Sequence, residues 1–286
     1  MEHSREIGPI LARPVADCTA VEVADAVTRS FEGYLVPLRF TPEAYERRFR
    51  AENLDPYASR LYFRAGSLAG VMLVSRRGWT RRVSAMGFVP EARGQGLGRW
   101  ALGEVIAEAR SQGERAVVLE VIEQNTPAVA LYDKVGFVAR RRLVGYRWGS
   151  VPGLDSPGAL VEIDPLDFAR VVAREGEPDL PWMLAAETLS AAAPPARAYR
   201  LDDRAFVLIG DPAAERLAIS ALVVPRGHRR QGWGTRLLRA LAAAFPGRPL
   251  LISPIVPEDL APEFFARLGW ERQELSQLEM RLEVGD

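Results

Sequence analysis

The sequence predicts two related domains in tandem, each an α/β or α+β sandwich in which strands alternate with helices. The main observation is an internal repeat, since RGQGLG at Arg93–Gly98 returns as RRQGWG at Arg229–Gly234, about half a chain later. In both halves an apolar, strand-like run ending in Val-Pro precedes the motif and a helical pattern follows it. A length of 286 residues also suits two domains better than one. The segment 150–158 is rich in Pro, Gly and Ser, so we expect domains at 1–150 and 151–286.

Composition narrows the function classes. The chain is 48% hydrophobic and 26% charged, which suits a globular protein with a core. Its 37 basic residues balance 37 acidic ones, so we expect no nucleic-acid partner. No apolar run approaches the ~20 residues of a membrane span, and the N-terminus has no leader-like stretch, so we expect no membrane association. One cysteine and two histidines predict a reducing, cytoplasmic location and no metal site.

The first half contains start and stop signals for most of its elements. Asp17 can cap a helix that runs to Ser30, and Thr41-Pro42 begins a second helix. Leu97 begins a third helix, which Gly113 ends. A fourth helix starts at Thr126. The remaining β-type runs predict strands at 61–65, 68–75, 79–89, 116–122, 137–143 and 145–148.

The glycine-rich turn can form an anion site. Gly94, Gly96 and Gly98 stand between a strand and a helix, where glycines let backbone N–H groups converge at the positive end of the helix. The turn lacks the Gly-Lys-Ser/Thr of a Walker loop and the G-x-G-x-x-G spacing of a dinucleotide fold. By itself the turn also fits a tight strand–helix connection with no ligand.

Two ordered motifs resemble the signatures of the GCN5-related N-acetyltransferase (GNAT) superfamily. Its first signature, R/Q-x-x-G-x-G/A, is matched by Arg93, Gly96 and Gly98. Its second is close to L-x-V-x-x-x-N-x-x-A-x-x-L-Y-x-x-x-G-F and is matched at Leu119, Val121, Asn125, Ala128, Leu131, Tyr132, Gly136 and Phe137. The resemblance covers residues 10–148 and, more loosely, 158–285. It implies that each half has a mixed, mostly antiparallel central sheet flanked by helices.

The resemblance also implies acetyl-CoA as cosubstrate and direct acetyl transfer to an amine. The cofactor's pyrophosphate would lie on the turn, at Arg93, Gly94, Gln95, Gly96, Leu97, Gly98 and Arg99. The pantetheine arm would pair with backbone groups of Met86, Gly87 and Phe88, and Asn125 would hydrogen-bond it. Tyr132 would protonate the departing thiolate, because a phenol with a pKa of about 10 is neutral at pH 7.

Glu120 is the candidate general base for the amine. It interrupts the apolar run Val117–Ile122, where a carboxylate needs partners or a raised pKa. Ribosomal-protein alanine acetyltransferases of the family place their base in a similar Leu-Glu-Val context, five residues before the asparagine. A structural hydrogen bond or solvent exposure explains Glu120 equally well. The pairs Arg81-Arg82 and the run Arg140–Arg142 are expected to form solvated faces.

The second half keeps the turn but loses the acid–base groups. The turn residues Arg230, Gln231, Gly232, Trp233 and Gly234 make it a second candidate CoA site. Counting back from Gly269, Phe265 replaces Tyr132 and Glu258 replaces Asn125. We therefore expect catalysis in the first half, in a monomer whose halves imitate a dimer or in a homodimer.

Two other functions fit the same residues. One is a CoA-binding sensor or interaction module without turnover, although such a protein does not need Tyr132. The other is an acyltransferase that uses another acyl-CoA. The acceptor is expected to be an amine of a small molecule or a peptide, and the segment Phe31–Tyr34 with the helix after Thr41 would roof its cleft.

Overall fold

The computed structural model describes residues 9–149 and 159–285. The predicted boundary segment 150–158 lies outside the described residues. The chain forms two compact units, one of Met1–Arg140 with Leu278–Asp286 and the other of Arg141–Gln277. The units therefore differ from a division at 150/151, because each includes a strand from the other half of the sequence.

The sheet of the first unit runs in the order β1-β2-β3-β4-β5-β12. Its β1–β2, β2–β3 and β3–β4 pairs are antiparallel, and β4–β5 is parallel. This agrees with the expected mixed, mostly antiparallel sheet. The strands are β1 (Ile10–Pro14), β2 (Arg60–Arg64), β3 (Ser67–Arg77), β4 (Thr80–Phe88), β5 (Ala116–Ile122) and β12 (Glu271–Glu283).

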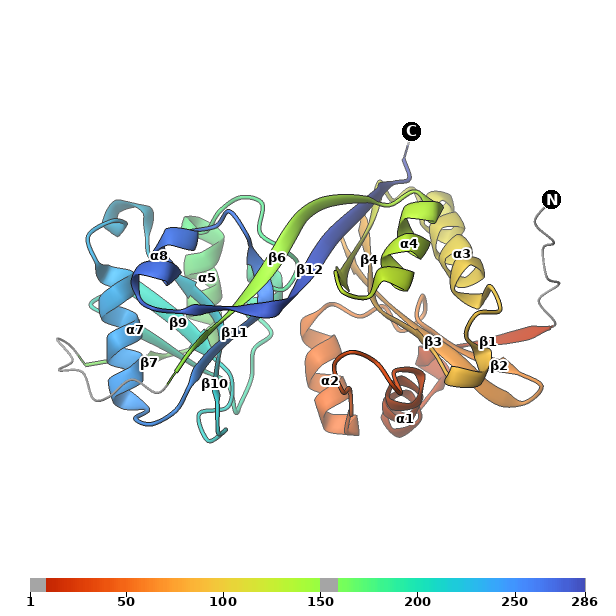
Figure 1. The fold of residues 1–286 in the computed structure, drawn as a ribbon, viewed down its shortest axis with the longest axis horizontal. Coiled ribbons are helices and arrows are strands. Elements are labelled where there is room, and N and C mark those ends of the chain that lie inside the picture. Colours follow the sequence, from red (N-terminus) through yellow and green to blue (C-terminus); the bar gives the residue numbers. More distant parts are fainter. Residues whose placement is uncertain (1–8, 150–158, 286) are drawn as a thin grey trace. The chain divides into compact units, whose positions relative to one another are not determined.

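Helices cover both faces of this sheet (Figure 1). Alternate residues of β3 enter different cores, since Val71 and Leu73 pack toward α1 and α2 while Met72 and Val74 pack toward α3. All four side chains are fully buried, which explains why the middle of β3 has consecutive apolar residues rather than alternating ones. The helices are α1 (Ala20–Ser30), α2 (Pro42–Ala51), α3 (Leu97–Ser111) and α4 (Thr126–Val135), with short 3-10 turns η1 (Val15–Asp17) and η2 (Pro90–Ala92).

The sequence signals locate most element ends correctly. Thr41 caps α2 with Pro42 in its first turn, as predicted. The cap of α1 is Thr19 rather than Asp17, because Thr19 and Glu22 form a reciprocal capping box. The expected strands 137–143 and 145–148 are one strand, β6 (Val138–Trp148). Gly145 is not a break: a Cβ there would lie 2.8 Å from the Ile252 carbonyl oxygen, so glycine permits close chain approach.

The second unit repeats the plan with the strand order β6-β11-β10-β9-β8-β7. The β10–β11 pair is parallel, and the β6–β11, β9–β10, β8–β9 and β7–β8 pairs are antiparallel. Val207 and Ile209 of β9 pack with α7, whereas Phe206 and Leu208 pack with α5. Its elements are β7 (Val161–Ile163), α5 (Pro165–Glu175), α6 (Ala186–Leu189), β8 (Arg197–Leu201), β9 (Ala205–Ile209), β10 (Leu217–Val223), η3 (Arg226–His228), α7 (Trp233–Ala244), β11 (Leu250–Pro257) and α8 (Pro262–Arg267).

Each core contains residues from the other half of the chain. Met280 and Val284 of the C-terminal segment are buried with α3 and β5 residues in the first unit. The Val284 amide donates to the Arg115 carbonyl oxygen at 2.9 Å. In the second unit, Val144 and Tyr146 of β6 are buried with α7 and β11 residues. Residues 1–150 alone therefore lack part of their core.

We expect Met280→Ala to lower the free energy of unfolding by about 2–5 kcal/mol, because it removes a fully buried side chain and leaves a cavity. Leu11→Ala is the matched control, since Leu11 lies in a strand of the same unit but is 65% exposed, and its change should stay within about 0.5 kcal/mol. Chemical denaturation measures both. Equal effects would mean that the C-terminal strand does not contribute to the core of the first unit.

Candidate active site

The central feature of the first unit is the separation of β4 from β5. Their parallel pairing runs from Thr80↔Ala116 to Val83↔Leu119 and goes no further, although β4 continues to Phe88 and β5 to Ile122. A bulge at Ser84 disturbs the β3–β4 register at the same point. Beyond the bulge, the edge of β4 that faces β5 has no strand partner among residues 9–149 and 159–285, so its backbone can pair with an extended ligand.

Met86, Gly87 and Phe88 lie on this edge, which is the segment expected from the sequence to bind the pantetheine arm. Met86 and Phe88 pack their side chains against the core beside α3. Gly87 faces α1 on the other side, where a Cβ would lie 2.9 Å from the Ser30 carbonyl oxygen and equally close to the Phe31 ring. Glycine is needed there so that the end of α1 can approach the strand.

The glycine-rich turn forms a cradle of main-chain amides at the start of α3. Gly94 and Gly96 have φ values of 70° and 84°, a region that disfavours side chains. In the described part of the chain, the amides from Gly94 to Arg99 donate to no backbone or side-chain acceptor. A row of free N–H groups at the positive end of a helix is suited to a phosphate.

Arg93 holds this turn in place. Its guanidinium donates to the carbonyl oxygens of Phe88 at 2.8 Å, Glu32 at 2.6 Å and Ser30 at 3.2 Å. Gln95 similarly donates to the Glu91 carbonyl oxygen at 2.6 Å. These side chains tie the turn to β4 and to the end of α1, so their direct effect is on the shape of the cradle.

The other members of the turn differ in role. Leu97 is buried in the core and anchors α3, whereas Arg99 is exposed on the first turn. A Cβ on Gly98 would lie 3.0 Å from the Leu131 side chain, so this glycine allows α3 and α4 to pack closely. Gly94 and Gly96 are thus needed for the backbone conformation of the turn, and Gly98 for helix packing.

Asn125 and Tyr34 meet at the start of α4. The Asn125 side chain caps this helix by accepting from the Ala128 amide at 3.4 Å. The Tyr34 hydroxyl forms a hydrogen bond with the Asn125 side chain, and burial raises the pKa of Tyr34. From the sequence, Tyr34 is expected only in a segment that roofs the cleft, because no spacing rule links it to a residue so far along the chain.

Tyr132 lies about two helical turns after Asn125 on α4 and is 7% exposed. Its ring contacts Phe137 edge-on, with centroids 5.8 Å apart. Burial, with a smaller contribution from the nearby Tyr34, raises the pKa of Tyr132 well above its ordinary value. The phenol therefore stays protonated at neutral pH and can act only as a proton donor there.

Glu120 is held in a buried charge network. Arg82 donates through Nε to Glu120 Oε2 at 2.7 Å and through a terminal nitrogen to Glu52 Oε2 at 2.5 Å. Arg48 binds the other oxygen of Glu52 at 3.0 Å. Burial raises the pKa of Glu120, and Arg82 opposes this shift without cancelling it. The carboxylate is thus both paired and more basic than an ordinary glutamate.

The expected solvated face at Arg81-Arg82 is wrong. Arg81 is fully buried and pairs with Glu114 at 2.7 Å and Glu108 at 3.1 Å, while Arg82 is 4% exposed. Both interrupt an apolar environment much as Glu120 does. Arg82 and Glu120 are opposite charges on the neighbouring parallel strands β4 and β5. Their pairing could have been predicted from the sequence only if the strand order were known.

The turn of the second unit has the same backbone. Gly232 has a φ of 83° before α7, and Arg230 adopts a φ of 60° at the position of Gly94. Arg229 donates to the carbonyl oxygens of Val224 at 3.1 Å and Glu175 at 2.6 Å, as Arg93 does at its own turn. The motif residues Arg230, Gln231, Gly232, Trp233 and Gly234 therefore form an equivalent turn, in which an arginine replaces one glycine.

The chemical groups of the second unit differ. Phe265 contacts Trp270 edge-on at 5.7 Å, which resembles the contact of Tyr132 with Phe137 in the first unit. Phe265 has no hydroxyl, and Tyr146 stacks on it at 4.1 Å. Glu258 pairs with Arg272 at 2.5 Å and with Arg142 at 3.3 Å, so it does not cap α8, whose N-cap is Ala261.

Comparison with known proteins finds similarity within the first unit. Residues 22–137 match the model of the acetyltransferase (GNAT) family, so this segment of the chain is similar to that family. The chain is also 35% identical over 132 residues to mycothiol acetyltransferase from Thermobispora bispora. That match covers 42% of this chain and 43% of the relative, so the chain spans less than half the length of this relative.

Solved structures extend the fold to the whole chain. A putative acetyltransferase from Pyrococcus horikoshii has a TM-score of 0.70 at 18% identity, covering 97% of this chain and 90% of its own. A tandem GNAT protein from the clavulanic acid biosynthesis pathway has a TM-score of 0.65 at 18% identity, covering 97% and 99%. The chain thus has the fold of tandem GNAT proteins.

Two features are absent from the described residues 9–149 and 159–285. No helix there is both long enough and apolar enough to cross a bilayer. No three His, Cys, Asp or Glu side chains there are grouped as metal ligands.

The turn can be tested through its backbone. Gly96→Ala should lower the free energy of unfolding by about 1–2 kcal/mol, because an L side chain is strained at a φ of 84°. Gly103→Ala in the same helix has open space and should raise it by up to about 1 kcal/mol. A Gly96→Ala variant as stable as Gly103→Ala in thermal and chemical unfolding would contradict the left-handed turn.

Proposed function

We propose that the first unit is an acetyl-CoA-dependent N-acetyltransferase that moves an acetyl group directly to a primary amine of a small molecule or peptide. The observation that carries this proposal is the position of a protonated, buried phenol, Tyr132, on the helix that Asn125 begins. The similarity of residues 22–137 to the GNAT family supports the reaction class.

The main chain fits the cofactor's extended and anionic parts. The unpartnered edge of β4 at Met86–Phe88 would bind the pantetheine amides, and the free amides from Gly94 to Arg99 would bind the pyrophosphate. When bound, acetyl-CoA supplies the thioester carbonyl that an amine attacks. The Asn125 side chain, which accepts the capping hydrogen bond from Ala128, would also hydrogen-bond the pantetheine arm.

Tyr132 and Glu120 suit opposite proton transfers. Tyr132 keeps its proton at neutral pH and would give it to the leaving sulfur. Glu120 would accept a proton from the attacking amine, directly or through water, since burial makes it more basic than usual. Arg82 would hold the carboxylate in one orientation while the proton arrives.

The second unit would not carry the reaction. Its turn keeps the backbone of an anion cradle, so Arg230–Gly234 stay a proposed CoA-binding segment. Phe265 cannot donate a proton, and Glu258 is committed to two arginines. A sensor without turnover is less well supported, because pure binding would not require the Tyr132 hydroxyl.

Tyr132→Phe should lower kcat by about 10²–10⁴-fold while leaving CoA affinity nearly unchanged, because only proton donation is lost. The measurement is thiol release from acetyl-CoA across a panel of primary amines. Tyr57→Phe is the control, since Tyr57 is 75% exposed, and it should have no effect. The proposal is wrong if Tyr132→Phe keeps full activity while Phe265→Tyr or damage to the second turn abolishes it. The second unit would then carry the reaction.

Glu120→Gln should lower kcat/KM by a comparable factor and remove the acid limb of its pH profile. The base must be ionised, so wild-type activity should fall as the pH drops through a pKa above the ordinary value of 4.5 for glutamate. Asp133→Asn, on the exposed face of α4, should keep the wild-type profile. An acid limb that persists unchanged in Glu120→Gln would leave water or the substrate as the proton acceptor.

A further inference from the structure

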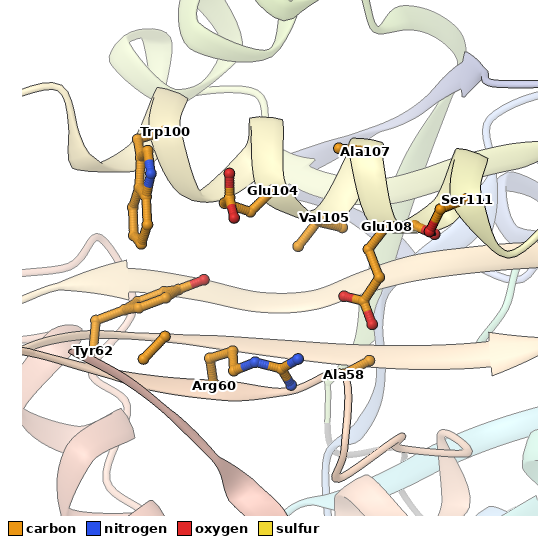
Figure 2. A pocket seen from close by; sticks show the side chains of 10 residues that line it. Ala58, Arg60, Tyr62, Trp100, Glu104, Val105, Ala107, Glu108 and Ser111 are labelled. Carbon is orange, nitrogen blue, oxygen red and sulfur yellow. The ribbon is translucent and has the colours of Figure 1, made fainter. Parts of the chain in front are cut away.

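The charged side chains of the first unit differ in their access to water. Glu104 is exposed at a cavity of about 440 Å³ between α3 and β2, where Arg60 from the opposite wall offsets its charge (Figure 2). By contrast, the side chains of Glu52, Arg82 and Glu120 are at most 9% exposed. Because water screens buried charges poorly, a change of charge at one of these three groups acts strongly on the other two.

Arg82 is shared between two carboxylates that come from different elements. Its Nε donates to Glu120 Oε2 on β5 at 2.7 Å, and its Nη1 donates to Glu52 Oε2 at the end of α2 at 2.5 Å. The same Nη1 also donates to the Ser84 hydroxyl at 3.1 Å. One buried cation therefore contacts two buried anions, so each carboxylate weakens the effect of Arg82 on the other.

Glu52 keeps its negative charge in this network. Burial acts to raise the pKa of Glu52, but Arg82 and Arg48 outweigh burial, so this pKa lies below its ordinary value. Arg48 contacts the second oxygen, Glu52 Oε1, through its Nε at 3.0 Å. At neutral pH, Glu52 is thus a fixed anion in contact with the arginine that pairs with Glu120.

The pKa of Glu120 is shifted in the opposite direction. Burial raises this pKa, Arg82 lowers it, and the negative charges of Glu279 and Glu52 raise it again. Glu279 comes from β12, which neighbours β5 in the sheet, and its carboxylate lies 3.8 Å from Arg140. Charged groups on β4, α2 and β12 therefore act together on this one carboxyl group.

We propose that Glu52 is a positioning residue of the acetyl transfer, which competes with Glu120 for Arg82 and so leaves Glu120 able to accept the proton of the attacking amine. The proton moves from the amine nitrogen to Glu120, and Arg82 stays paired with Glu52. Without the charge of Glu52, Arg82 would stabilise the ionised form of Glu120 more strongly. This role rests on the proposed function of Glu120 as the general base.

Glu52→Gln tests this role, because glutamine keeps the shape of the side chain and removes its charge. NMR titration of isotope-labelled glutamate carboxyl groups in the full chain should place the titration midpoint of Glu120 about 1 pH unit lower than in the wild type. The acid limb of kcat/KM should move to lower pH by the same amount. Glu46→Gln is the matched control on α2 and should move neither, since Glu46 is exposed and lies 3.9 Å from Arg50.

Arg48→Met should change the network in the opposite direction. It removes a cation that binds Glu52, while methionine keeps an apolar stem beside the rings of Phe40 and Phe49. The negative charge near Glu120 is then less compensated, so the midpoint of Glu120 should rise and the acid limb should move to higher pH. A merely structural disturbance would not shift the two variants in opposite directions.

Two measurements separate this role from the proposed function. An unchanged or raised midpoint of Glu120 in Glu52→Gln would overturn the role of Glu52, even if Glu120→Gln still removed the acid limb and so supported the base. A lower midpoint with an unmoved acid limb would instead contradict Glu120 as the base, and with it the role of Glu52 in the reaction. If Glu52→Gln does not fold, a midpoint that fails to rise in Arg48→Met overturns the role.

Discussion

The early end of the β4–β5 pairing is the constraint on which the rest of the first unit depends. A parallel pair that continued past Val83 and Leu119 would saturate the β4 backbone and leave nothing for an extended ligand. Because the strands separate, the turn after β4 and the helix α4 after β5 lie at the two sides of an open edge. The proposed roles of the glycines, Asn125 and Tyr132 all depend on this separation of the strands.

A network of buried charges holds Glu120 in position beside this opening. Arg82 joins a strand beside the opening to α2 through Glu52, and to β5 through Glu120. Removing Arg82 would take the shared cation away from the buried Glu52 and Glu120 carboxylates, which is strongly destabilising. The network therefore fixes where the Glu120 carboxylate stands, and its burial makes that carboxylate a better proton acceptor than one in water.

The two units share a backbone plan but differ in the side chains at the equivalent positions. Both have a left-handed turn before the long helix, an arginine that ties the turn to carbonyl oxygens, and an edge-on aromatic pair near the last helix. The second has lost the phenol and the capping asparagine. The exchanged strands β6 and β12 complete each core, so neither half of the sequence contains a complete sheet.

The sequence by itself determined the repeat, the order of elements and the residues of the turn, because helix caps, glycine positions and apolar periodicity are local signals. It also singled out Tyr132 and Glu120 as the donor and acceptor candidates. Only the tertiary structure decided which strands complete each sheet, that Arg81 and Arg82 are buried, and that Tyr34 meets Asn125. These depend on contacts between residues far apart in the chain, and a single sequence contains no local signal for such pairings.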